Sequence, residues 1–362
     1  MPSPGQWLRS QWPIALSIIL GMAAGAVVVW LYGADPINSL YVLLTGFLYY
    51  PDLVLVNASV LMLTALAFAI PLRVGFFNIG AEGGVIMGAV IAVSVAVFTG
   101  SSFAAMLASV VAGAILGGIV AFLRLKLSVN EVLSTIMFNW IIYWVGLYIV
   151  TAILADPLYP QRSVRVPEEA MLPRWPSQEV TIAGYTIYPG TLPSILLISL
   201  ATTAVTWIVM YYTLPGLRYR FVGSNEQAAL IRGTRVDLVK ALSLTVAGAL
   251  AGLAGSLIVL GFSGSVDVTL GGVRNYGFDG IGVALVGKNH PLGIIAASMF
   301  FSDLRSGSAW LQIAEGVPPE LAEMVNGVIV YSIAALAGIH YILGSRPLDR
   351  ILEILGLRVR RG

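Results

Sequence analysis

The side chains that could contact a polar solute gather where glycines interrupt apolar stretches. Asn78 and Glu82 stand in the run from Gly75 to Gly84, between two stretches long enough to cross a bilayer. Irregular backbone at membrane depth must be covered by protein or water, and a carboxylate there is costly against lipid. We therefore expect Glu82 to face a cavity or a partner. A second interpretation stays open, in which Glu82 only caps the helix that follows it.

A second interruption, between Asn275 and Gly282, contains Phe278 and Asp279. It again combines glycine, an aromatic ring and a carboxylate. The two interruptions are five apolar stretches apart, so they would enter the membrane from opposite sides. Inverted repeats place a site between two such broken helices. The shared pattern is only a few residues long, and chance similarity is the other interpretation.

A third group follows the polar run at residues 128–135. Asn139, Tyr143 and Gly146 are spaced i, i+4 and i+7, so they share one helix face, and Trp140 lies beside them. Amide and ring groups on one face could pass a ring-bearing polar solute, although aromatic residues near span ends also form interfacial belts. Because Trp140 and Trp144 fall within a predicted span, the pathway interpretation is favoured.

A fourth group lies in the basic segment 214–240. Ser224 and Gln227 have the spacing of a capping box with Ser224 as the N-cap, and Gly233 suits a helix end. A helix of about two turns is too short to be stable alone in water. Leu230 and Ile231 give it apolar surface to bury. It is either a solvated turn between spans or a helix that docks on a cytoplasmic subunit.

The composition shows which elements must position these groups. The chain has 362 residues, 58% hydrophobic and 10% charged, whereas soluble proteins carry about 25% charged residues. Cysteine is absent, which excludes a disulfide framework, an iron–sulfur cluster and a thiol nucleophile. Two histidines are too few for most zinc sites, and a net charge of +2 gives no argument for nucleic acid. The chain is predicted to be a polytopic membrane protein.

Apolar stretches predict an all-α bundle of about eight to ten transmembrane helices in a single domain, 1–362, with broken helices and possible inverted repeats. Glycines four residues apart, such as Gly113 with Gly117 and Gly248 with Gly252, predict close helix crossings. The eighth and ninth spans are short and are predicted to form a broken pair. The spans are 12–32, 53–72, 84–100, 103–123, 131–154, 191–213, 241–261, 278–287, 291–304 and 321–343.

Charge placement predicts the topology, because cytoplasmic loops collect lysine and arginine. With the N-terminus inside, 15 of these residues fall inside and 5 outside. Both termini, the segment 214–240 and the basic tail 344–362 are therefore predicted to be cytoplasmic. The segment 155–190 contains six prolines, which forbid a long helix, and is predicted to be an external loop. Asp303 and Arg305 are expected to end a helix at the external face.

Several motifs together resemble one known family. Residues 77–83, 223–225 and 228–233 are similar to the permease subunits of ABC importers of the ribose and branched-chain-amino-acid type. Residues 130–137, 277–285 and 316–318 look closer to the nucleoside-import branch, and the loop at 155–190 is typical of the larger of its two permeases. The resemblance runs from about residue 50 to 343. Gly84, where the family usually has Gln, and Leu230, where it usually has Arg, depart from the pattern.

The resemblance implies a multi-pass permease of the cell membrane that forms a pore with a second, homologous permease. It implies no catalytic residue, metal or cofactor on this chain: ATP and Mg would be bound by a separate cytoplasmic ABC ATPase. An external substrate-binding lipoprotein would deliver the nucleoside, and nucleic acid is no partner. Residues 282–289 almost match a Walker A motif, but Asn289 replaces the magnesium-binding Ser or Thr.

The family pattern assigns Asn78, Glu82 and Asp279 to the polar breaks near the pathway. It assigns coupling to the ATPase to Ser224, Asn225, Glu226, Gln227, Ala228, Ala229, Arg232 and Gly233. Two alternatives remain: a sugar or a branched-chain amino acid as the substrate, or an ion-coupled secondary transporter in which Glu82 or Asp279 binds the ion.

Overall fold

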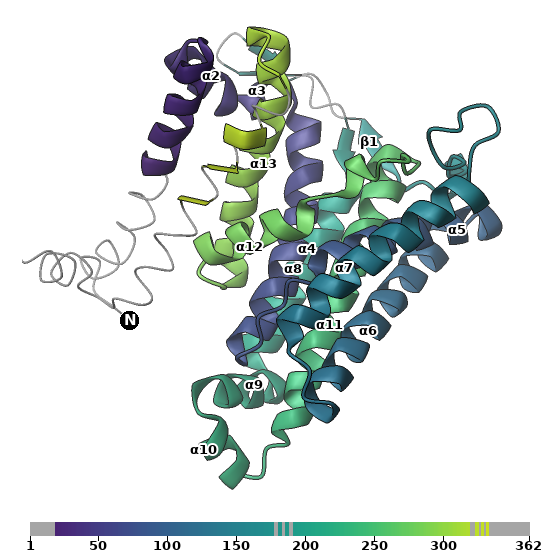
Figure 1. The fold of residues 1–362 in the computed structure, drawn as a ribbon, viewed down its shortest axis with the longest axis vertical. Coiled ribbons are helices and arrows are strands. Elements are labelled where there is room, and N and C mark those ends of the chain that lie inside the picture. The colour runs from purple at the N-terminus through teal and green to yellow at the C-terminus, as the bar shows by residue number, and fades with distance from the viewer. Residues whose placement is uncertain are drawn as a thin grey trace, which may run out of the picture. The chain divides into compact units, whose positions relative to one another are not determined.

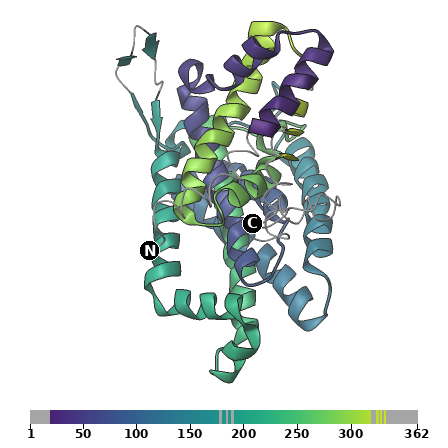
Figure 2. The same cartoon turned by 90° about the vertical axis from the view of Figure 1, so that its left-hand side faces the viewer.

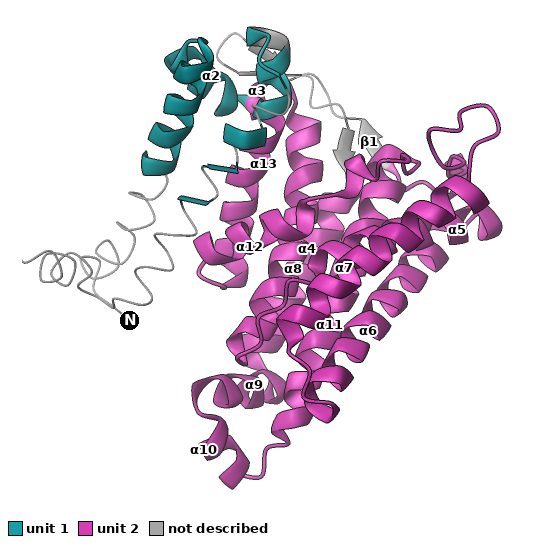
Figure 3. Cartoon of the chain, in the orientation of Figure 1, with its two compact units in different colours: residues 1–45, 307–362 teal, residues 46–306 magenta. Residues whose placement is uncertain are grey.

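A computed structural model describes residues 19–176, 180–182, 185–187, 191–318, 323–325, 327–328 and 331–332. Figure 1 shows its helices, and Figure 3 shows two compact units, formed by residues 1–45 with 307–362 and by residues 46–306. The predicted tail 344–362, most of the predicted span 321–343 and the start of the span 12–32 lie outside the described residues. Which side of a membrane each end faces stays a prediction.

The larger unit is a helical bundle. Six of the described helices are long and apolar enough to cross a membrane, which confirms the predicted all-α polytopic class. The unit contains α3 (Gly46–Tyr49), α4 (Pro51–Arg73), α5 (Ala81–Thr99), α6 (Ser102–Lys126), α7 (Glu131–Tyr148), α8 (Ser194–Tyr212), α9 (Leu214–Ser224), α10 (Glu226–Ile231), α11 (Val236–Ile258), α12 (Tyr276–Val286) and most of α13 (Pro291–Glu315).

The helices begin where local side chains satisfy their first N–H groups. The Asn130 side chain accepts a hydrogen bond from the Val132 N–H at the start of α7, and Ser101 accepts one from Ala104 at the start of α6. The predicted break between the eighth and ninth spans is present, because α12 ends at Val286 and α13 begins at Pro291. The ninth span is longer than predicted, since α13 runs on to Glu315. The predicted span 131–154 ends in a π-helical turn at Ile149–Ile153, and α11 ends in another at Val259–Ser263.

Close crossings of α11 with α5 and α6 form the centre of this unit. A Cβ atom on Gly113 would lie 2.1 Å from the carbonyl oxygen of Gly248, and one on Gly88 would lie 2.1 Å from that of Gly252. Only glycine allows backbones to approach this closely. The prediction that the spaced glycines pack helices together is confirmed. The most deeply buried spanning helix is α4, which includes the fully buried Phe68.

The segment 155–190 has no α-helix in its described part, as its prolines predict. It contains a 3-10 turn at Glu168–Ala170 and the paired strands β2 (Val180–Ile182) and β3 (Tyr185–Ile187). Its strand β1 (Arg174–Pro176) pairs antiparallel with β4 (Thr191–Pro193), which follows the segment directly. These strands are a small departure from a purely helical chain. The segment also joins the loop after α11, since the Ser163 N–H donates to the Val266 carbonyl at 2.8 Å.

The smaller unit includes an apolar helix, Ile19–Tyr32, and α2 (Pro36–Leu43). The Asp35 side chain caps α2 by accepting a hydrogen bond from the Ile37 N–H. The Asn38 side chain of α2 donates to Glu315 at the end of α13.

Candidate functional site

The chain between α4 and α5 leaves the helix and is held in place by Asn78. The Asn78 amide nitrogen donates to the Ala67 carbonyl at 3.1 Å, and its amide oxygen accepts from the Gly80 N–H at 2.9 Å. The side chain is 5% exposed. The predicted interruption is therefore present, and the polar atoms of Asn78 are used to fold it.

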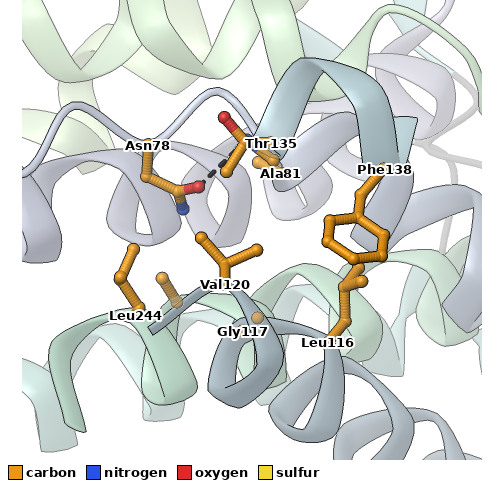
Figure 4. A pocket seen from close by; sticks show the side chains of 11 residues that line it. Asn78, Ala81, Leu116, Gly117, Val120, Thr135, Phe138 and Leu244 are labelled. Carbon is orange, nitrogen blue, oxygen red and sulfur yellow. Dashed lines mark hydrogen bonds between the residues drawn. The ribbon is translucent and has the colours of Figure 1, made fainter. Parts of the chain in front are cut away.

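A small cavity lies beside this turn (Figure 4). Its volume is about 20 Å³, which holds about one water molecule and no organic solute. Asn78 and Thr135 supply its polar groups, and Leu116, Val120, Phe138 and Leu244 supply most of its apolar wall. Asn78 thus borders a water-sized space within this chain.

Glu82 joins the two glycine-rich interruptions, which are far apart in sequence. Its carboxylate accepts hydrogen bonds from the N–H groups of Asn275 at 2.7 Å and Gly277 at 2.9 Å. A Cβ atom on Gly277 would lie 2.2 Å from the Glu82 backbone nitrogen, so the starts of α5 and α12 are in direct contact. Glu82 lies in the first turn of α5, as the capping interpretation requires, but that is not its only role. It also caps α12, whose first N–H groups need an acceptor.

An ion pair continues this junction on α12 and α13. Arg305 donates to the Asp279 carboxylate at 2.7 Å, and its guanidinium lies 4.1 Å from the centre of the Tyr276 ring. The Tyr276 hydroxyl donates to Asn57 on α4, whose amide nitrogen donates to Ser306. We call Glu82, Asn57, Tyr276, Asp279 and Arg305 the junction network.

The position of Arg305 corrects the expectation that it ends a helix. The helix α13 runs on to Glu315, so Arg305 and Asp303 both lie inside it. Sequence reasoning missed Arg305, although an arginine within an apolar helix signals a partner of opposite charge. Within the described residues, no group of three or more His, Asp or Glu side chains could hold a metal ion.

Asn139 belongs to the packing around the first interruption. Its amide oxygen accepts from the Gly83 N–H at 2.8 Å, and its amide nitrogen donates to the Ile79 carbonyl at 3.0 Å. Gly146, on the same face of α7, lies against Ile86 of α5. This face of α7 thus fixes the helix to α5.

The aromatic residues of α7 lie elsewhere. Trp140 and Trp144 are 56% and 60% exposed on this chain, so they do not line a path between its own helices. Tyr143 is half-buried, and the guanidinium of Arg274 lies 5.1 Å from the centre of its ring. Phe278 is 46% exposed at the start of α12. The predicted solute contacts of these residues stay predictions.

The packing around Gly84 explains why this chain lacks the Gln that the family usually has at this position. A Cβ atom at this position would lie 2.5 Å from the Cβ of Ala251 on α11. The space that a Gln side chain would need is filled by α11. Position 84 therefore belongs to the helix crossing.

The basic segment contains two helices where one was predicted. Residues 214–224 form α9, so Ser224 is its last residue, and the Ser224 hydroxyl donates to the Arg220 carbonyl. The N-cap of α10 is Asn225, whose side chain accepts from the Ala228 N–H at 2.9 Å. The prediction of Ser224 as the N-cap is wrong by one residue, because α9 still holds Ser224 in helical conformation.

The end of α10 is as predicted. Gly233 has a φ of +76°, which suits glycine, and the Thr234 N–H donates to the Ala229 carbonyl at 3.0 Å. Glu226 forms an ion pair with Lys240 on α11 at 2.7 Å.

The burial of α10 is one-sided. Ala229 packs in an apolar cluster with Val74, Val222 and Val236. Leu230 is 55% exposed and Ile231 88% exposed, and the rest of the predicted coupling set is also exposed: Ser224, Asn225, Glu226, Gln227, Ala228, Arg232 and Gly233. The helix is held by the buried Ala229 and by the Glu226–Lys240 ion pair, and its larger apolar side chains remain uncovered on this chain.

Comparisons with known proteins cover most of the chain. A profile of the family described as "Branched-chain amino acid transport system / permease component" matches residues 50–334. The guanosine ABC transporter permease protein NupP of Bacillus subtilis is 31% identical over 91% of this chain and 94% of its own. The glucose ABC transporter permease protein TsgB13 of Haloferax volcanii is 31% identical over 90% and 87%. A second Bacillus subtilis protein, the guanosine ABC transporter permease protein NupQ, is 28% identical over 78% and 89%.

Proposed function

This chain belongs to the permease component family of branched-chain amino acid transport systems, and from that premise we propose that it moves nucleosides into the cell as part of an ATP-driven importer. The resemblance expected from its motifs is confirmed at the level of the family. The observation that carries the nucleoside assignment is the 31% sequence identity, over 91% of this chain, with a protein named as a guanosine permease. The glucose permease among its relatives makes a sugar the second candidate substrate.

The partners proposed for this chain follow from its class and from its exposed surfaces. A second permease would complete the pore, which is supported by two guanosine permeases of one organism that both match this chain. A separate cytoplasmic ATPase would bind ATP and Mg, and an external lipoprotein would deliver the solute. The assembly would lie in the plasma membrane.

The ATPase would dock on α10. A short helix with a firm cap at each end moves as one piece, whereas a loop would absorb an applied motion. Exposed Leu230 and Ile231 are the apolar surface that such a partner would cover. A motion of α10 would reach α4 through the apolar cluster around Ala229 and through Gly223, where a Cβ atom would lie 2.1 Å from the Arg73 carbonyl oxygen.

The same motion would continue to the junction network. Arg73 donates to the Asn289 carbonyl at 2.6 Å, in the turn that ends α12. The other end of α12 is held by Glu82 and by the Asp279–Arg305 pair. ATP binding would shift the population between outward and inward openings through these contacts. A nucleoside is neutral and polar, so a path with its charges already paired offers hydrogen bonds without trapping the solute.

The test is uptake by vesicles that hold this chain with its co-purifying partners. We expect ATP-dependent uptake of labelled guanosine that exceeds uptake of glucose and leucine. Preferential uptake of glucose would assign the sugar instead. Uptake by the purified chain alone, driven by an ion gradient and insensitive to ATP, would overturn the importer proposal and support the secondary transporter.

A further inference from the structure

The helix α9 leaves the bundle crosswise to α8, as Figure 2 shows at the foot of the larger unit. Its exposed apolar side chains are Leu214 at 71%, Leu217 at 39% and Phe221 at 40%. Their spacing of i, i+3 and i+7 places all three on one face. Val222 is buried on the bundle side. A helix that lies across the spans with an outward apolar stripe is typical of helices in a membrane interface.

Arginines flank this stripe. At 100° per residue, Arg218 falls on one side of the Leu214–Leu217–Phe221 face and Arg220 on the other, and both are exposed. Long arginine side chains beside an apolar stripe can reach the headgroup level of a bilayer while the stripe enters it.

A third arginine joins them at the end of α8. Arg73 donates to the Tyr211 hydroxyl at 2.8 Å, and Arg220 donates to the Tyr211 carbonyl at 3.4 Å. Both guanidinium groups lie over the Tyr211 ring, at 5.4 and 5.5 Å from its centre. The ring of His290 is 5.0 Å away, and burial followed by the charge of Arg73 lowers the pKa of His290, which favours its neutral form.

The positive charge of this region has no acidic partner in the part of the chain that the structure describes. None of the ion pairs found there includes Arg73, Arg218 or Arg220. Two guanidinium groups on one tyrosine ring repel each other, and an anion beside them would offset that repulsion. The surface therefore combines an apolar stripe with arginines that no carboxylate of the described residues pairs with.

We propose that the outward face of α9, with the exposed Arg218 and Arg220, binds an anionic phospholipid of the cytoplasmic leaflet, and that the half-buried Arg73 adds positive charge beside Tyr211. The arginines bind the phosphate, and Leu214, Leu217 and Phe221 contact the upper part of the acyl chains. Clusters of arginine next to spanning helices are the usual recognition element for anionic headgroups. The site does not depend on which solute the permease carries, and the proposal stands or falls separately from the nucleoside assignment.

The test measures lipid bound to the full-length chain. The protein is placed in nanodiscs of phosphatidylcholine with one fifth phosphatidylglycerol. Native mass spectrometry then counts the phosphatidylglycerol molecules that stay bound to the protein when it is released from the nanodisc. The variant carries Arg218→Gln with Arg220→Gln. The matched control removes two exposed arginines away from α9, with Arg165→Gln and Arg235→Gln. Each arginine near the surface contributes about a fivefold change in affinity. We expect the variant to lose about 30-fold in phosphatidylglycerol affinity and the control to match the wild type.

Equal retention by the variant and the control would overturn the proposal, as would equal retention of phosphatidylcholine and phosphatidylglycerol by the wild type. A separate arm adds excess inorganic phosphate. Full competition by free phosphate would show a phosphate site and not a lipid site. The variant Leu217→Cys gives a further check of what covers this face. If the partner proteins block chemical modification of the introduced cysteine, and phosphatidylglycerol does not change that modification, the face is a protein interface. That result would overturn the proposal of lipid binding.

Discussion

The charges of the junction network are paired within the chain, whereas the arginines of α9 are left at the surface. In the network, Glu82 accepts two backbone N–H groups, and Asp279 and Arg305 pair at 2.7 Å. On α9 the arginines are exposed, and none has a carboxylate partner among the described residues. A charge satisfied within the chain fixes helix positions, whereas a charge left at the surface is available to another molecule. The comparison predicts that substitutions in the network lower folding stability more than substitutions at α10, whose main effect is on function.

The largest effect is expected for Arg305→Ala. It leaves Asp279 without its ion-pair partner in a mostly buried place, which costs up to about 3–5 kcal/mol in the free energy of unfolding, and less here because the pair is partly exposed. Replacing both partners, with Arg305→Met and Asp279→Leu, should recover most of that loss. Unfolding of the purified chain in detergent measures both variants. A double variant as unstable as the single one would show that the pair is not the cause.

Glu82→Ala is expected to have the next largest effect. It leaves the N–H groups of Asn275 and Gly277 without an acceptor, at a cost of about 1–3 kcal/mol for the buried Gly277 N–H and less for the exposed Asn275. Nucleoside uptake should fall, because α12 loses its fixed start. Glu82→Gln keeps one acceptor oxygen and should lose less. If both variants are as stable as the wild type, the hydrogen bonds of Glu82 do not stabilise the junction network.

Asn225→Ala tests the corrected cap. Loss of a side-chain cap costs about 1 kcal/mol, and the effect should be confined to α10. Amide hydrogen exchange of α10 should quicken in this variant and stay unchanged in Ser224→Ala. The opposite result would restore Ser224 as the cap.

Ala228→Trp is expected to have the smallest effect on stability, within about 0.5 kcal/mol, because the residue is exposed. The bulky ring should nevertheless block docking and abolish ATP-driven uptake and ATPase stimulation in the reconstituted complex. The thermal unfolding of the chain alone serves as the control. Normal uptake by this variant would show that α10 is not the docking helix.

The sequence predicts the parts of this fold that depend on local composition. Apolar length predicts the spanning helices, and spaced glycines predict the crossings at Gly113 and Gly248. It does not predict which distant groups pair. Glu82 caps α12 by pairing with Asn275 and Gly277, which lie 193 and 195 positions further along the sequence. No local sequence pattern predicts a pairing over that distance.

The cap of α10 and the helix α9 were missed for local reasons. Ser224 and Asn225 are both good N-cap residues, and the choice between them depends on where the preceding helix ends. Pro215 and Gly216 suggest a turn by composition, yet proline is well suited to the first turn of a helix, and Thr213 caps α9 by accepting from the Gly216 N–H.

The glycine crossings of α11 limit how this protein can move. Where main-chain atoms of α5, α6 and α11 touch without side chains between them, sliding one helix past another would first have to separate the three. We expect these helices to travel as a rigid core through any transport cycle. Any bending would then fall outside this three-helix core.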